Sequence, residues 1–196
     1  MKRWSVPLAV GLALIGAQAR FAAPPADLVA AFIQLCGETH GDATAALARA
    51  DALGWTIPTR PVSRLQVADL GAPVSRNGRV WIGETQTWSL LVGAAGGNAG
   101  YRDCSVGTVP RRGAPPPDFA AMRGELQAWV GAPPIAKHDL PAFTVFAFAD
   151  GPGGRQRLPY GDDPLANDAP RADGVAIVTL QTVLGITMMI FQTPAS

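Results

Sequence analysis

The sequence predicts an α+β domain, in which two N-terminal helices precede an antiparallel sheet of about five strands with one helix packed across a face. Two observations predict this class. Apolar residues recur at helical spacing twice near the start of the chain and once more beyond its middle. Segments of alternating apolar and polar residues fill much of the remainder, and loops rich in Gly and Pro separate them.

Residues 1–19 have the three parts of a cleavable secretory signal. A basic start is followed by an uncharged apolar run over residues 5–17 and by a small-x-small cleavage site that ends at Ala19. The run is shorter than the roughly 20 residues of a membrane span, and an uncleaved N-terminal anchor is the alternative. We therefore expect a single globular domain over residues 20–196, either periplasmic or secreted.

The charges of the chain are nearly balanced, with 16 Lys and Arg against 15 Asp and Glu. Loss of Lys2 and Arg3 with the signal leaves a formal charge of about −1. This balance argues against a nucleic-acid partner, which would require a basic excess, and it gives no general attraction to anionic membranes. The composition, with few Lys and much Ala, Gly and Pro, is typical of a GC-rich bacterial genome and indicates no cofactor.

The two cysteines, Cys36 and Cys104, predict one disulfide, because an exported chain folds in an oxidising compartment. The bond closes a long loop, which is worth about 4 kcal/mol at most in the chain-entropy model. A reactive thiol is the alternative.

Two helices are expected at the start of the mature chain. Leu28, Phe32 and Cys36 follow helical spacing up to Gly37. Asp42 is placed to cap a second helix that ends before a glycine, and we expect the next residue, a tryptophan, to pack beneath it. Residues 56–78 are broken by Pro and contain at most one short helix, near 63–70.

Strand-like sequence begins after this crossing. We expect strands at 79–82, 85–92, 101–109 and 143–148, with a glycine-rich hairpin loop at 93–100 and a long Gly/Asp/Pro loop at 150–173. Because Cys104 and Val106 share a face, the disulfide is expected to join the first helix to the inner face of the sheet. A third helix over 119–130 is capped by Asp118 and ends at Gly131.

The final apolar stretch, residues 174–191, has two interpretations. Its length is near the lower limit of a membrane helix, which would anchor the protein. Its Val, Ile and Thr content favours strands, and no Lys or Arg follows it to hold a cytoplasmic end. We predict two strands joined near Val183–Gly185, and therefore no stable membrane span after signal cleavage.

Two clusters resemble catalytic chemistry. Cys36, Glu38 and His40 bring a thiol, a carboxylate and an imidazole together, as a nucleophile–base pair or a metal site would require. His138 and Asp139 would serve as a general base and its orienting carboxylate, with Ser105, Ser89 or a thiol as the nucleophile. Neither cluster matches a complete motif.

Two kinds of loop are candidates for ligand sites. Neither the glycine-rich loop at 93–100 nor the one at 151–157, which carries Arg155 and Arg157, is followed by the helix that a phosphate cradle needs. Oxygen ligands in the last long loop would suit Ca²⁺ but match no EF-hand spacing. These ligands are Asp162, Asp163, Asn167, Asp168 and Asp173.

The sequence therefore assigns no catalytic, cofactor-binding or metal-ligating residue. We expect a non-enzymatic exported domain that binds a protein partner or a small molecule, because long loops on a rigid scaffold often carry binding. A hydrolase-type enzyme that uses His138 and Asp139 is one alternative, and a membrane-anchored periplasmic protein is the other.

Overall fold

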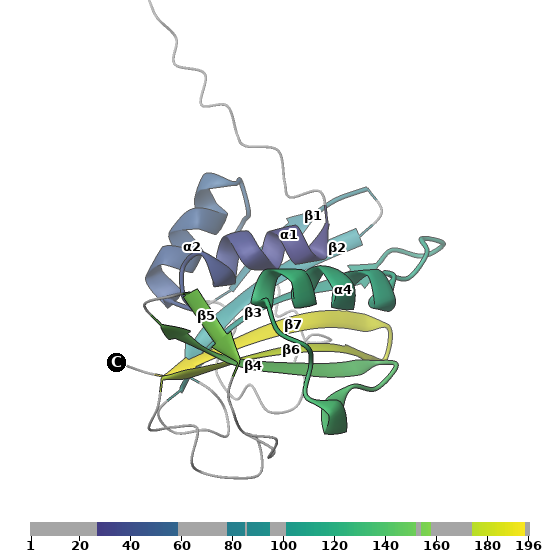
Figure 1. The fold of residues 1–196 in the computed structure, drawn as a ribbon. Coiled ribbons are helices and arrows are strands. Elements are labelled where there is room, and N and C mark those ends of the chain that lie inside the picture. The colour runs from purple at the N-terminus through teal and green to yellow at the C-terminus, as the bar shows by residue number, and fades with distance from the viewer. Residues whose placement is uncertain are drawn as a thin grey trace, which may run out of the picture.

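The fold is α+β, as predicted, with helices on one face of an antiparallel sheet (Figure 1). The computed structural model describes residues 27–58, 78–84, 86–94, 101–151, 154–157 and 174–194. The expected signal at 1–19, the short helix near 63–70 and the aspartate-rich loop lie outside these described residues.

The two N-terminal helices form where their caps predict. Helix α1 spans Leu28–Phe32, and the Asp27 carboxylate accepts a hydrogen bond from the amide of Ala30 at 2.7 Å. Its chain continues as a single π-helical turn, η1, over Ile33–Gly37. Helix α2 spans Ala43–Ala52 and is capped by Asp42, whose carboxylate accepts from the amide of Ala45. Trp55 is buried just beyond it, as expected.

The described part of the sheet has seven strands in the order β1-β2-β3-β7-β6-β4-β5, and every neighbouring pair is antiparallel. The expected strands form, and the hairpins β1–β2, β2–β3 and β6–β7 join sequence neighbours. The bounds are β1 Gly78–Ile82, β2 Gln86–Ala94, β3 Tyr101–Pro110, β4 Phe143–Gly151, β5 Gly154–Arg157, β6 Val175–Val183 and β7 Ile186–Pro194.

The sequence does not predict strand β5, since Gly154–Arg157 lies within the loop expected at 150–173. The segment has no apolar alternation from which a strand is recognised. It forms by pairing with the end of β4, with Phe148 opposite Arg157 and Asp150 opposite Arg155. Backbone pairing to an existing edge, rather than side-chain pattern, therefore extends the sheet here.

The C-terminal apolar stretch forms the predicted strand pair. Strands β6 and β7 pair from Ile177 opposite Gln192 to Val183 opposite Ile186, and the turn between them is Leu184-Gly185. The interpretation of residues 174–191 as a membrane helix is wrong, because both halves satisfy their backbone groups in the sheet. Among the described residues, the structure has no helix with the length and apolar character to cross a membrane.

The third helix, α4, spans Phe119–Val130 and lies over the same face of the sheet as α1 and α2 (Figure 1). The Asp118 carboxylate accepts hydrogen bonds from two amides of its first turn, and Gly131 ends the helix with φ of 75°. A short 3₁₀ turn, η2, over Ala136–His138 leads into β4.

The disulfide between Cys36 and Cys104 joins η1 to strand β3 with a Cα–Cα distance of 5.5 Å. Both cysteines are fully buried on the helix-facing side of the sheet. The predicted attachment of the first helix to the inner face is therefore confirmed.

An aromatic cluster fills the space beside the disulfide. Trp129 of α4 makes edge-to-face contacts with Phe32 of α1, Phe148 of β4 and Phe191 of β7 at centroid distances of 5.8 to 6.2 Å. These contacts join both helical layers to the centre of the sheet. Gly37 faces the same ring, and a Cβ atom there would lie 2.5 Å from Cζ2 of Trp129.

We expect Gly37→Ala to destabilise the fold by about 1–3 kcal/mol, because the added methyl group overpacks the aromatic cluster. The matched control is Gly124→Ala in α4, where a Cβ atom would meet nothing within 4 Å. That change should stabilise the protein by about 0.5–1 kcal/mol, since Ala is the better helix former. Urea unfolding measures both, and equal effects of the two variants would contradict the packing account.

Candidate functional site

The first predicted cluster does not form a nucleophile or a metal site. Cys36 is in the disulfide and has no thiol to offer. The Glu38 carboxylate pairs with the guanidinium of Arg49, and His40 lies in the exposed turn before α2 with φ of 51°. The described residues contain no group of three or more His, Cys, Asp and Glu side chains placed to hold a metal ion.

In the second cluster, Asp139 is engaged by a cation other than its neighbouring histidine. Arg123 of α4 donates two hydrogen bonds to its carboxylate, and the hydroxyl of Thr144 donates a third at 2.6 Å. These donors, Arg123 first, hold the pKa of Asp139 below its usual value. The His138 ring lies edge-on to Phe143 at 6.1 Å. The carboxylate thus fastens α4 to the start of β4.

The two candidate serines lie away from His138. Ser89 and Ser105 are buried, and each is within 3.4 Å of a backbone carbonyl that can accept from its hydroxyl. Ser105 on β3 is separated from β4 by β7 and β6, which places them about 14 Å apart at the usual strand spacing. The described residues therefore do not bring His138, Asp139 and a serine or thiol together for hydrolysis.

Arg155, a candidate anion contact, has a structural role. Its guanidinium lies 3.9 Å from the centroid of the Trp129 ring, and Nη1 donates to the Trp129 carbonyl at 2.7 Å. The contact joins β5 to the last turn of α4. The side chain of Arg157 and the loops 95–100 and 158–173 are outside what the structure describes.

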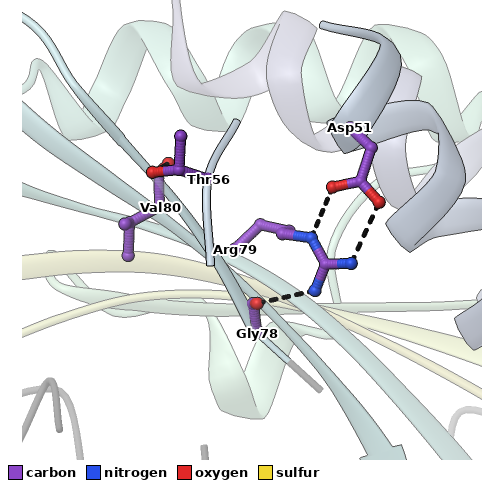
Figure 2. Close-up of polar contacts among 5 residues, drawn as sticks. All are labelled: Asp51, Thr56, Gly78, Arg79 and Val80. Carbon is purple, nitrogen blue, oxygen red and sulfur yellow. Dashed lines mark hydrogen bonds and ion pairs between the residues drawn. The ribbon is translucent and has the colours of Figure 1, made fainter. Parts of the chain in front are cut away.

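A different site lies at the edge strand β1, which two sets of contacts hold in place (Figure 2). Arg79 forms a bidentate pair with the Asp51 carboxylate of α2, with Nε–Oδ1 of 2.5 Å and Nη2–Oδ2 of 3.0 Å, and Nη1 donates to the carbonyl of Gly78. The Arg79 side chain is only 11% exposed. Bidentate geometry fixes direction as well as distance, so β1 is oriented against α2.

The second contact is a backbone bridge. Thr56 and Val80 exchange both amide-to-carbonyl hydrogen bonds at 2.8 Å. Because peptide groups alternate between the two sides of a strand, those of Ile82 point to the same outer edge as those of Val80. The bridge is at the middle residue of β1, so the peptide groups of Ile82 are not part of it.

A pocket of about 570 Å³ opens widely to solvent at the end of β1. Trp81 and Ile82 supply its apolar wall, Gly83 its turn, and Glu84 and Arg111 opposite charges. Arg111 reaches it from the end of β3 and donates to the carbonyl of Gly83 at 3.1 Å. Ile82 is 68% exposed, so the described residues leave this part of the apolar wall open to solvent.

The pocket wall is continuous with the core through three tryptophans. Trp81 makes an edge-to-face contact with Trp88 at 6.2 Å, and Trp88 makes one with Trp55 at 6.5 Å. The indole N–H groups of Trp55 and Trp88 are buried and have no hydrogen-bond acceptor among the described residues. Such donors are usually satisfied by ordered water. Because it contacts Trp88, which is part of the core, the Trp81 ring packs against a rigid support.

No protein-family model matches this chain, and neither the curated proteins nor the solved structures contain a match to it. The candidate site therefore stands on its own geometry.

Sequence reasoning missed this pocket. The sequence predicts the strand at 79–82, but nothing in it shows that Arg111, 28 residues beyond Gly83, lies beside the end of this strand. The available signal was an apolar residue, Ile82, directly before a Gly-Glu turn, which is an unusual place for an exposed isoleucine.

We expect the fold to lose stability as the pH falls below about 4, because two carboxyls have pKa values lowered by arginine partners. Arg79 lowers the pKa of Asp51, and Arg123 with Thr144 lowers that of Asp139. A lowered folded-state pKa means stabilisation that is present above the unfolded pKa and is lost as the pH falls through the folded one.

Urea midpoints measured from neutral to acid pH test this dependence. Asp51→Asn and Asp139→Asn should each be less stable at neutral pH and less sensitive to acid than the parent. Glu125→Gln, an exposed change on α4, is the control and should keep the parent's profile. Identical acid profiles for all four proteins would refute the assignment.

Proposed function

We propose that this chain is an exported, non-enzymatic domain that binds a protein partner or a small ligand in the pocket formed by Trp81, Ile82, Gly83, Glu84 and Arg111. One observation carries the proposal. An apolar wall and a pair of opposite charges face solvent in one hollow, on a strand that an ion pair and a backbone bridge hold rigidly. Binding sites commonly combine apolar walls with a few fixed polar groups.

The chemistry of the pocket suggests the kind of ligand. An apolar group would pack on Trp81 and Ile82, while Arg111 would attract a carboxylate or carbonyl and Glu84 an amine or amide. The outward peptide group of Ile82 adds a backbone donor and acceptor at the sheet edge. An extended peptide segment satisfies all of these groups at once, so a peptide-like ligand fits best.

Export is the second part of the proposal. It rests on the signal-like residues 1–19 and on a single buried disulfide, which persists in oxidising compartments. A periplasmic or secreted location would also expose the pocket to partners outside the cytoplasm.

Affinity capture from the exporting cell tests the pocket, with the mature domain as bait. Ile82→Asp should lose any specific partner, because it puts a charge on the apolar wall. Ile57→Asp is the matched control, because Ile57 is also an exposed isoleucine, at 57%, and does not line the pocket. A partner that both variants retain, or both lose, would contradict binding in this pocket.

The mass of the protein recovered from that cell tests export. We expect residues 20–196 with two hydrogens fewer than the reduced chain, and a gain of those two hydrogens on reduction. Retention of residues 1–19, or free thiols on both cysteines, would refute this part of the proposal.

A further inference from the structure

One end of the sheet carries most of the exposed apolar side chains of the described residues. We call it the turn end, and define it by residues 82–84, 110–113, 137–142 and 183–185. Of the five large hydrophobic residues that are exposed in the described part of the chain, four lie there, the exception being Ile57. The four are Ile82 at 68%, Leu140 at 55%, Val183 at 48% and Leu184 at 97% exposed.

The strand order places these segments in one row. The β1–β2 turn, the end of β3, the β6–β7 turn and the start of β4 follow one another across the sheet and lie at the right in Figure 1. The amide of Thr182 donates to the carbonyl of Ala142 at 2.9 Å, which joins the β6–β7 turn to the segment before β4. The row crosses five strand spacings, about 24 Å.

Leu184 adopts a backbone conformation that is unfavourable for leucine. Its φ is 52° and that of Gly185 is 78°, as the two central residues of a type I′ turn require. Asn or Gly is favoured at the first of these positions, because other side chains are strained at positive φ. A leucine that is both strained and almost fully exposed gains no burial among the described residues, which points to a contact outside them.

The polar groups of the turn end are mostly cationic. Arg111, Arg112 and Lys137 are exposed there, beside the carboxylates of Glu84 and Asp139. Asp139 is already paired with Arg123. The turn end is therefore electropositive, although the chain as a whole is close to neutral.

We infer that the turn end docks on the surface of a lipid bilayer that contains anionic phospholipid. Protruding apolar side chains enter the boundary between headgroups and acyl chains, and neighbouring cations bind the lipid phosphates. The observations favour a bilayer over a protein groove, because the apolar residues project in a wide row with cations between them. The inference goes beyond the proposed pocket ligand, since Leu184 and Leu140 do not line the pocket.

Co-flotation of the mature protein with vesicles tests the inference. The parent should float with phosphatidylcholine vesicles that contain phosphatidylglycerol and be released by salt, and it should float poorly with phosphatidylcholine alone. Leu184→Asn should bind about tenfold more weakly, the effect of removing one buried leucine. Because Asn-Gly is the preferred type I′ pair, the same variant should have a melting temperature higher by about 3 °C.

The controls separate docking from folding and from the pocket. Ile57→Asn replaces an exposed residue away from the turn end and should float like the parent. The inference is overturned if the parent does not float with anionic vesicles, or if Leu184→Asn and Ile57→Asn bind alike. It is also overturned if Leu184→Asn abolishes capture of a protein partner but leaves flotation unchanged. Failure of the Ile82→Asp capture experiment bears on the pocket and leaves the flotation result of Leu184→Asn standing, because Leu184 does not line the pocket.

Discussion

The disulfide between Cys36 and Cys104 is the constraint on which the rest of the structure depends. It fixes the end of the first helical segment to β3, the third of the seven described strands. That attachment places Phe32 against Trp129 and Phe191, so the helices and the sheet meet in one aromatic cluster. The ion pair between Arg79 and Asp51 then holds the edge strand β1, where the pocket lies, against α2.

Much of the fold could be predicted because its signals are local. Asp42 and Asp118 cap helices, Gly131 ends one, and a high content of Val, Ile and Thr marks the strands of the C-terminal hairpin. The disulfide followed from the count of two cysteines and the expected export. The predicted sheet was short by strand β5, because its residues carry no pattern of their own and are a strand only through their pairing with β4.

The candidate site could not be predicted for the opposite reason: its groups come from distant parts of the chain. The sequence suggests that Asp139 orients its neighbour His138. In the structure, the Asp139 carboxylate instead accepts hydrogen bonds from Arg123, which lies on a different helix. Arg111 meets Gly83 only because β3 ends beside the β1–β2 turn. The near-neutral net charge likewise could not predict the cations of the turn end, because a net charge does not say where the charged residues lie.

The three linked tryptophans make the pocket visible to spectroscopy. Trp81 lines it and contacts Trp88, which in turn contacts Trp55 in the core. A ligand that covers Trp81 would change the polarity around one indole and leave the other two in place. Intrinsic fluorescence therefore offers an unlabelled reporter of occupancy, and edge-to-face coupling among the rings gives circular dichroism a second one.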